Sequence, residues 1–308
     1  MSARSCIAAV IGAFESASLV ALGERHWARE DAEFRLRLIR HPDFAWKAQD
    51  IVVEFASGRH QDLLDGFMKG RDVLAAELPR VWRDTTQPGA WDSPVYEDFF
   101  RAVREVNGNL PPDRRLRVLA GDPGIDWDAV PEGPQLRRMV DQRDRFAAAV
   151  IEPEVLSRGR KALLVFGALH VWRNRPGSIV DLLRANSAAR HFVIVPVGGE
   201  PVAGLISEPA SPVDPVLVRL AESPVGGLEA NDLFRTDTKR VKVVDGKIVL
   251  VPAQLFDAGV KARDVADAGL YFGGAPPEMV PRPEWIAGSE YGREIDRRRS
   301  ILTKLPPG

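Results

Sequence analysis

Four short apolar runs in this chain each lead to residues that can take part in acid–base chemistry or bind a metal. The runs and the residues after them are 19–22 with Glu24 and His26, 51–53 with Glu54, 116–120 with Asp122, and 163–166 with His170. The stretches between these runs have apolar residues at helical spacing, which indicates strands that alternate with helices. This order predicts an α/β fold with a mostly parallel central sheet flanked by helices.

The positions of the polar residues predict a candidate site. In parallel α/β folds, ligands bind in the loops at the carboxyl ends of the strands. We therefore expect two glutamates, two histidines and an aspartate to meet at one edge of the sheet. Asp122 precedes Pro123, so it fits a turn residue equally well.

We expect one domain, although 308 residues could also form two smaller ones. The expected parts are a core at about 1–200 with a strand at 265–274, an insertion at 200–264 and a Pro-rich tail at 275–308 that wraps the surface. The insertion contains a small β-hairpin around Asp245-Gly246, because strand-like residues flank that turn dipeptide.

Further elements follow from periodicity and from residues that end helices. Helices are expected at 6–14, 28–40, 95–106 and 135–151, and strands at 192–196 and 269–274. The strand before Glu54 is expected to end there, and Ser57 is expected to cap a helix that carries Leu63 and Phe67.

Composition limits the partners and the chemistry. Formal net charge is −1, and the basic run Arg297-Arg298-Arg299 has acidic neighbours, so we expect no nucleic-acid partner. Cys6 is the only cysteine, which excludes an internal disulfide and a cysteine-based zinc cluster. The apolar stretch around Cys6 is too short for a membrane span and lacks a signal-peptide cleavage motif. We expect a cytoplasmic protein, with export as the alternative if a signal sequence has been removed.

Glu24 and His26 form a recognisable acid–base pair. A carboxylate beside an imidazole raises its basicity and fixes its tautomer, and such a histidine can take a proton from water near neutral pH. Glu54 and His170 could orient His26 or move a second proton. Arg35, in the helix after His26, could stabilise an oxyanion or hold the carboxylates in place.

Several other kinds of chemistry lack their motifs. The chain has no G-x-S-x-G nucleophile motif, no glycine-rich phosphate loop and no H-E-x-x-H pair. A hydrolase built on this sequence would therefore use activated water rather than a covalent serine or cysteine intermediate. Structural roles compete with functional ones: single strand-end residues are often only hydrogen-bonded, His41 fits a helix cap, and Trp82, Trp91 and Trp127 fit core or pocket wall.

The motif Leu22-Gly23-Glu24-Arg25-His26 resembles the opening motif of the erythromycin esterase-like superfamily. That superfamily also holds the ChaN-like haem-binding proteins and, more distantly, the TIKI/TraB proteins. Further similar segments are Phe34-Arg35, Val52-Val53-Glu54, residues 65–70, Gln142-Arg143-Asp144, Gly167-Ala168-Leu169-His170 and residues 267–273.

The resemblance implies a parallel sheet flanked by helices, with His26 as general base, Glu24, Glu54 and His170 as its partners, and Arg35 as electrostatic helper. The chain differs from the esterases because one residue, not two, separates Glu24 from His26. It is also shorter than a macrolide esterase, and its G-x-x-H segment is nearer the ChaN and TraB types. The resemblance therefore implies the site and not a macrolide substrate.

Three functions with a small-molecule partner follow. The first is a serine-independent hydrolase of an ester or lactone. The second is a ChaN-like protein that binds haem or another ligand without turnover, with His26 or Tyr271 as haem ligand. The third is a divalent-metal site made of Glu24, His26, Glu54 and His170, since histidines and carboxylates are suitable ligands. No cofactor is predicted for the first function.

Overall fold

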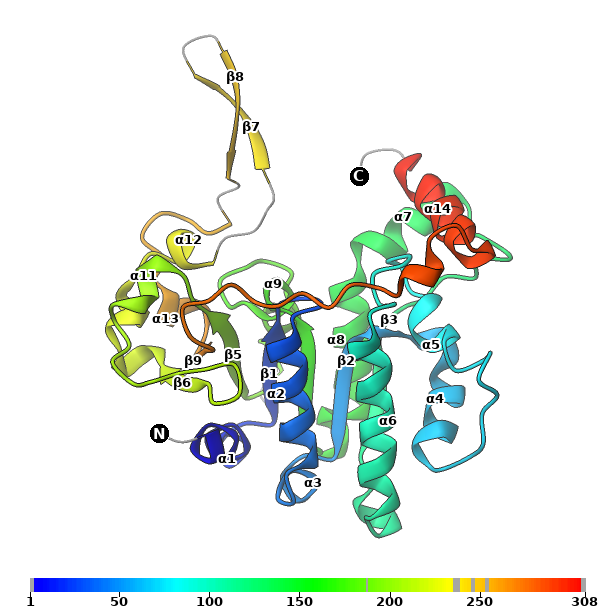
Figure 1. The fold of residues 1–308 in the computed structure, drawn as a ribbon, viewed down its shortest axis with the longest axis horizontal. Helices are drawn as coiled ribbons and strands as arrows, with labels where there is room; N and C mark the ends of the chain where they lie inside the picture. The colour runs from blue at the N-terminus through cyan, green and yellow to red at the C-terminus, as the bar shows by residue number, and fades with distance from the viewer. Residues whose placement is uncertain (1–2, 187, 235–238, 245–246, 253–254, 306–308) are drawn as a thin grey trace.

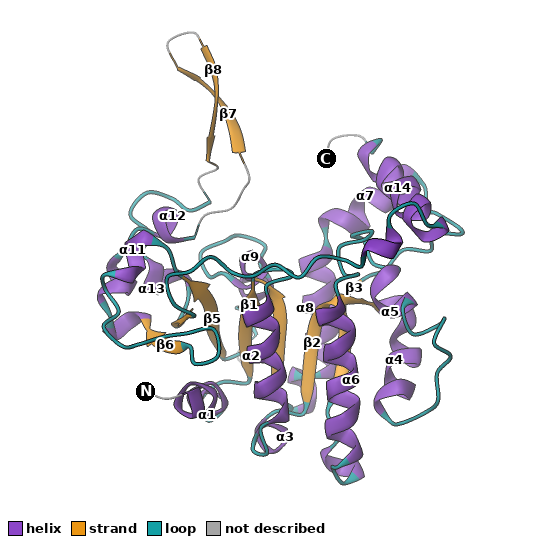
Figure 2. Ribbon diagram, viewed as in Figure 1, coloured by secondary structure: helices purple, strands orange, loops and turns teal. Residues whose placement is uncertain are grey.

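A seven-stranded sheet forms the centre of the molecule, with helices on both faces (Figures 1 and 2). The computed structural model describes residues 3–186, 188–234, 239–244, 247–252 and 255–305. The strand order is β3-β2-β4-β1-β5-β9-β6, and neighbours are parallel except for β6, which is antiparallel to β9. The strands are β1 (Leu19–Glu24), β2 (Asp50–Ser57), β3 (Arg117–Asp122), β4 (Ala162–Gly167), β5 (His191–Val197), β6 (Val216–Arg219) and β9 (Ala268–Tyr271). The predicted fold class is confirmed.

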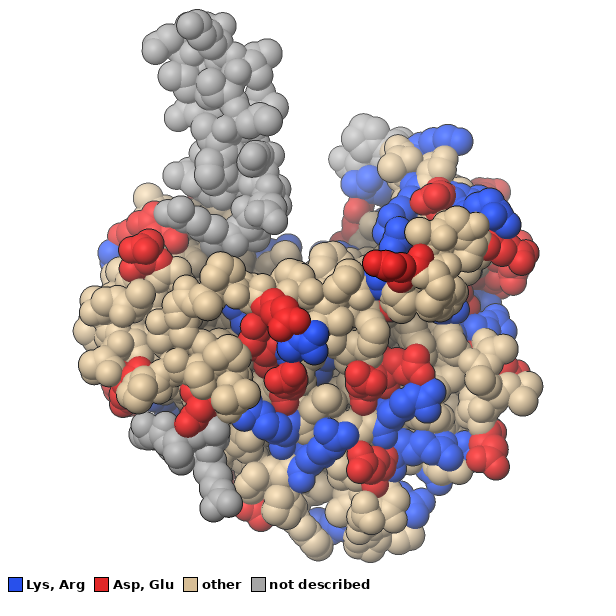
Figure 3. All heavy atoms as spheres, viewed as in Figure 1, with Lys and Arg blue, Asp and Glu red and all other residues tan. Residues whose placement is uncertain are grey.

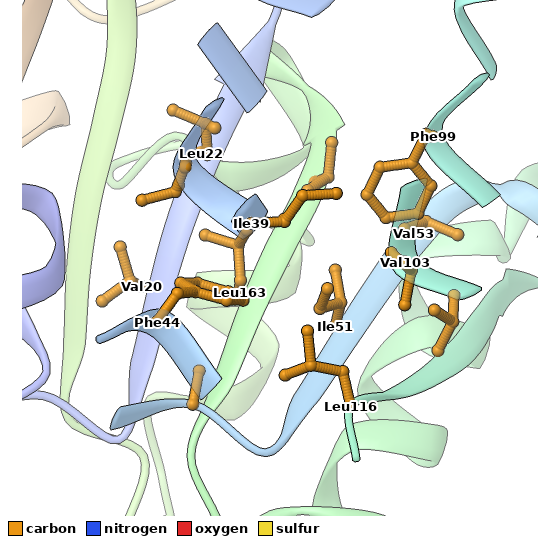
Figure 4. Packing of buried hydrophobic residues seen from close by; sticks show 14 of the residues in the cluster. Val20, Leu22, Ile39, Phe44, Ile51, Val53, Phe99, Val103, Leu116 and Leu163 are labelled. Carbon is orange, nitrogen blue, oxygen red and sulfur yellow. The ribbon is translucent and has the colours of Figure 1, made fainter. Parts of the chain in front are cut away.

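The first face of the sheet is covered by helices from the N-terminal third of the chain. They are α1 (Ala3–Ala13), α2 (Arg29–Arg40), α3 (Phe44–Lys47), α4 (Gln61–Met68), α5 (Arg80–Arg83) and α6 (Pro94–Gly108). Figure 4 shows Ile39 of α2 and Phe44 of α3 packed near Val20 and Leu22 of β1. Cys6 of α1 is buried in the same cluster, as expected for a small apolar residue, and burial raises its pKa to about 12.

The second face carries the later helices. They are α8 (Arg143–Glu154), α9 (Ala168–Val171), α10 (Ile179–Leu183), α11 (Glu200–Ala203), α12 (Ala230–Leu233) and α13 (Ala262–Val265). Leu19 and Ala21 of β1 face this side, because side chains alternate along a strand. Both faces are therefore buried, which explains why the strands are apolar at consecutive positions.

A third, smaller cluster lies beyond β3. Leu136 of α7 (Gly133–Asp141) is buried there with Ile125 and Trp127, and Ile301 and Leu302 of α14 (Glu290–Thr303) pack against it. Short 3-10 helices complete the fold at Gly58–His60, Pro112–Arg114, Leu156–Arg158, Leu220–Glu222, Pro224–Gly227 and Glu284–Ile286.

The chain leaves β1 and β4 toward opposite faces of the sheet. β1 is followed by α2 on the first face, and the neighbouring β4 is followed by α9 on the second. Where the connections of adjacent strands diverge in this way, ligands commonly bind beyond the carboxyl ends of the strands. The polar residues at the ends of β1, β2 and β4 lie at this edge.

Two expectations near Glu54 were wrong. β2 continues past Glu54 to Ser57, with a shift in its register against β3 between Val53 and Ser57. Ser57 does not cap a helix: its hydroxyl has no hydrogen-bond partner among the described residues, and α4 begins only at Gln61. The physical reason is that Phe55 and Ala56 are apolar enough to extend the buried strand.

Other boundaries also differ from the sequence predictions. The helix expected at 135–151 is two helices, α7 and α8, that meet at Gln142, and β9 ends at Tyr271 rather than 274. β6 and α14 were not predicted. Strands β7 (Lys239–Val244) and β8 (Lys247–Pro252) pair antiparallel, while the Asp245-Gly246 turn of the predicted hairpin lies outside the described residues.

Two observations concern membrane spans and surface charge. Within the described ranges, no helix is long and apolar enough to cross a bilayer. On the face in Figure 3, acidic and basic side chains are interspersed rather than grouped by sign.

Candidate active site

Glu24 is the last residue of β1 and is anchored from the first face of the sheet. Its Oε2 accepts a hydrogen bond from Nη1 of Arg35, which α2 places beneath it with 1% of its surface exposed. Its Oε1 accepts a hydrogen bond from the Tyr96 hydroxyl of α6, at 3.1 Å. Arg35 also lies against the rings of Phe55 and Phe99. These contacts fix the Glu24 carboxylate in one position.

Glu54 of β2 is anchored from the second face. Its Oε2 accepts a hydrogen bond from the backbone N–H of Gly167 at 2.7 Å, and its Oε1 accepts one from Nε2 of Gln87 at 2.9 Å. Nε2 of His170 lies 3.3 Å from Oε1, and Nη1 of Arg143 lies 3.9 Å from the same oxygen. Glu54 is therefore surrounded by donor and charged groups from three separate segments: the β4–α9 segment, the loop with Gln87, and α8.

The His26 ring lies between the carboxylates of Glu24 and Glu54. Its Nδ1 lies 3.0 Å from Oε1 of Glu24, and its Nε2 lies 3.9 Å from Oε2 of Glu54. The ring sits against Gly167, where a Cβ would come within 2.8 Å of it, and meets the Trp91 ring edge-on at 4.9 Å. Its side chain is 30% exposed, against 5% and 6% for the two glutamates. His26 is thus the member of this group that solvent reaches.

His170 lies in the first turn after β4 and is enclosed by carboxylates. Its Nε2 faces Glu54, and its Nδ1 contacts Oδ1 of Asp144 on α8 at 2.5 Å. Arg175 pairs with the other oxygen of Asp144. Its side chain is 9% exposed. Both ring nitrogens of His170 are therefore engaged.

The surrounding charges keep both glutamates ionised. Burial alone would raise the pKa of Glu24, but Arg35 and then His26 outweigh it and lower that pKa. For Glu54, burial is again opposed, here by His170, His26 and Arg143, which hold its pKa well below its ordinary range.

The same carboxylates favour the charged form of both imidazoles. Burial would lower the pKa of His26, but its hydrogen bond to Glu24 and the charge of Glu54 raise it above 6.5. For His170, burial is overcome by Glu54 and Asp144, and the pKa is raised to about 9. His170 is consequently a cation at neutral pH.

Asp122 supports the cluster without joining it. It is buried at the end of β3 and accepts hydrogen bonds from the backbone N–H and hydroxyl of Thr86 and from the N–H of Gly124. Burial raises its pKa to about 6. Because Thr86 precedes Gln87, Asp122 fixes the loop that brings Gln87 to Glu54.

The C-terminal segment crosses the loop that carries His26, as Figure 1 shows for the stretch between β9 and α14. The N–H of Val280 donates to the Trp27 carbonyl, and the N–H of Arg29 donates to the Glu278 carbonyl, both at 2.8 Å. Ser93, before α6, donates its hydroxyl to the Val280 carbonyl. The loop is held in place by a segment from the other end of the chain.

The structure brings Glu24, His26, Arg35, Glu54 and His170 together, as the sequence predicted, and adds residues that the prediction did not include. These are Tyr96, Gln87, Trp91, Arg143 and Asp144. Arg143 and Asp144 had a signal, because they belong to a segment quoted for the family resemblance. Trp91 was expected only as core or pocket wall, and Tyr96 and Gln87 had no signal. His60 lies apart, where it pairs with Asp84.

Tyr271 is not part of the cluster. It lies on β9 with 7% of its surface exposed and packs in the apolar cluster of the second face. Within the described part of the chain, no hydrogen bond or ion pair joins it to His26 or to either glutamate. Tyr271 therefore lies outside the cluster around His26, and its role as a haem ligand stays a prediction.

The four predicted metal ligands are not arranged around a common divalent ion. Both nitrogens of His170 face carboxylates, and Nδ1 of His26 faces Glu24, so few lone pairs are free to point at a common ion. Among the residues that the structure describes, no group of three or more histidine, cysteine, aspartate or glutamate side chains is arranged to hold a metal ion.

The fold has counterparts among solved structures. A crystal structure of a Bacillus cereus protein aligns over 88% of this chain and 91% of that chain, with a TM-score of 0.51 and 11% identity. A succinoglycan biosynthesis protein aligns over 89% and 91%, at TM-score 0.49 and 10% identity. ChaN of Campylobacter jejuni, described with cofacial haem binding, aligns over 64% and 86%, at TM-score 0.41 and 17% identity.

The similarity to the Bacillus cereus protein shows the fold and not the activity. At 11% identity, the likeness to the Bacillus cereus protein shows a shared α/β architecture, and the weaker two carry no further conclusion. No family model matches the sequence, and no curated protein matches it.

Proposed function

We propose that this protein hydrolyses an ester or lactone, with a water molecule activated by His26. The observation that carries the proposal is the asymmetry of the cluster: His26 is reached by solvent, and the groups that orient it are buried and fixed. Its Nδ1 is held by Glu24, and its Nε2 lies 3.9 Å from Glu54, beyond hydrogen-bond length. The neutral ring therefore offers Nε2 to a water molecule.

The other groups have supporting roles in this proposal. Glu24 stabilises the imidazolium that forms when His26 takes the proton. Arg35 is too buried to reach a substrate, which favours the second of its two expected roles, holding Glu24 in place. Cationic His170 keeps Glu54 ionised. Arg143, with 25% of its side chain exposed near Glu54, is the candidate for stabilising the oxyanion of the tetrahedral intermediate.

The resemblance to the erythromycin esterase-like superfamily supports the same assignment. It rests on Gly23-Glu24-Arg25-His26, Val53-Glu54 and the Gly167 to His170 segment, and these three segments are in contact at one edge of the sheet. The lack of a G-x-S-x-G motif is consistent with direct attack by water.

The test is a panel of aryl esters and lactones assayed with wild type and His26→Ala. We expect kcat to fall about 10²- to 10⁴-fold, the usual contribution of a general base. His41→Ala is the matched control, because its side chain is 27% exposed and lies at the far end of α2. Equal activity in wild type and His26→Ala would remove His26 from the mechanism.

The same protein samples separate the two remaining functions. If no ester or lactone is turned over, a haemin titration tests ligand binding without turnover, and a Soret shift abolished by His26→Ala would support that function. If activity is present, dialysis against a chelator is expected to leave it unchanged. Loss of activity that zinc or manganese restores would favour the metal-dependent hydrolase.

A further inference from the structure

A cavity of about 400 Å³ opens beside the cluster, at the carboxyl ends of β5 and β9. Its lining combines aromatic and aliphatic side chains with glycines that follow the two strands, including Trp172, Val197, Gly198, Leu233 and Phe234. Its volume lies at the lower end of the range typical of small-molecule sites. The cluster of titratable residues described above does not line it.

The cavity adjoins His26 through two chain neighbours. Arg25, which lines it, directly precedes His26, and Ala168, which also lines it, follows the Gly167 that touches the His26 ring. Pro276 and Pro277 close another side, just before the C-terminal segment crosses the loop that carries His26. A ligand in the cavity would therefore lie next to the reacting centre.

The chemistry of the walls favours an uncharged, apolar group. Among the lining residues Arg25 carries the charge, and Asp31 compensates it: Nε and Nη2 of Arg25 lie 2.9 and 2.5 Å from Oδ2 of Asp31. Opposite, the ring of Trp172 packs on Phe234 at 5.5 Å. A ligand with a net charge would lose its hydration without gaining an unpaired counter-ion.

Trp172 forms a buried wall of this cavity, with 4% of its surface exposed. An aromatic ring offers a large apolar surface against which an acyl or ring group can pack.

We propose that this cavity binds the acyl or ring portion of a neutral ester or lactone, and that it sets the substrate class as compact apolar acyl groups. The inference rests on the proposed function for its catalytic part, because the bound group is placed beside His26. The cavity is a separate binding site, and the affinity of a ligand for it can be measured without turnover.

Gly198 provides a direct way to fill the cavity. A Cβ at Gly198 would meet no atom within 4 Å, so a larger side chain there extends into open space without backbone strain. Gly204→Phe is the matched control, because Gly204 is equally unobstructed, lies at the end of nearby α11 and does not line the cavity.

Two measurements on these variants test the inference. In Gly198→Phe, kcat/KM for p-nitrophenyl cyclohexanecarboxylate is expected to fall at least tenfold, while p-nitrophenyl acetate changes less than twofold. Calorimetric binding of cyclohexyl phenyl ketone, an unreactive analogue, should be lost in Gly198→Phe and retained in Gly204→Phe.

The outcomes distinguish the cavity from the reaction. Ketone binding that Gly198→Phe abolishes, without hydrolysis of either ester, would sustain the cavity and reject the proposed function. Absence of ketone binding to wild type, equal binding to Gly198→Phe, or an equal loss of both ester activities would overturn the cavity assignment. If Gly198→Phe does not fold, Gly198→Val gives the same comparison with a smaller side chain.

Discussion

The two glutamate–histidine pairs of this protein contain the same chemical groups and differ in their surroundings. In the first pair, Glu24 is buried against Arg35 and the His26 ring is 30% exposed. In the second pair, both partners are buried, and His170 has a carboxylate at each ring nitrogen. One imidazole is left with a nitrogen near solvent and the other is not.

The difference arises because the two pairs are held from opposite faces of the sheet. Glu24 is fixed by helices of the first face, and Glu54 by residues of the second face and by the N–H of Gly167. A glycine at the end of β4 lets the His26 ring lie between the two carboxylates. We therefore expect substitutions in the two pairs to have separable effects on rate and stability.

The largest effect on stability is expected from His170→Ala. Removing this ring leaves the buried carboxylates of Glu54 and Asp144 without their shared cation, and breaking a buried pair typically costs about 3–5 kcal/mol. His26→Ala is expected to cost only about 1 kcal/mol, because its ring is part-exposed. Urea denaturation of the two variants gives the free energies of unfolding.

The pH dependence of that measurement is its internal control. The folded-state pKa of His170 is raised from 6.5 to about 9, so its contribution to stability is complete below pH 6.5 and is lost as pH rises through about 9. The gap in unfolding free energy between wild type and His170→Ala should narrow over that range. A gap that is constant with pH would contradict a charged His170.

A smaller effect is expected in the pH–rate profile of wild type. Only neutral His26 can accept a proton, and its pKa is raised above 6.5 by Glu24 and Glu54. kcat/KM should therefore increase with pH, with its lower inflection above 6.5, and decline near pH 9 where His170 loses its charge. A lower inflection at or below 6.5 would indicate that another group is the base.

The smallest effect is expected from Tyr96→Phe, which removes one hydrogen bond to Glu24 and leaves the Arg35 contact. We expect a loss of about 1.5 kcal/mol in unfolding free energy and a few-fold decrease in kcat. Tyr291→Phe is the matched control, since Tyr291 donates to Asp92 outside the cluster. It should lose similar stability without losing rate, and an equal decrease in kcat would contradict a role specific to Glu24.

The sequence predicted the sheet because its strands are buried on both faces. A run of consecutive apolar residues, such as Ile51, Val52 and Val53, is typical of a strand that is buried on both faces of a sheet. The polar residues after each run then had to lie at one edge, because parallel strands end on the same side. This reasoning alone predicts that four residues lie close together, namely Glu24, His26, Glu54 and His170.

The errors occurred where local signals competed with packing. Ser57 looked like a helix cap, but the neighbouring apolar residues continue β2 and bury its hydroxyl. β6 is short and lies antiparallel at the edge of the sheet, so its pattern is weak. α14 follows a Pro-rich stretch, and it is held by an apolar contact with Trp127 and Leu136 that comes from distant segments.

The sequence by itself determined the class of fold and the groups available for chemistry, because the apolar pattern and its period are local properties of the chain. Only the tertiary structure decided which histidine is enclosed and which is accessible, since the charges around each ring come from segments far apart in the chain. Tyr96, Gln87 and Asp144 reach the cluster from outside the strand ends, and the environment that they create separates two otherwise similar pairs.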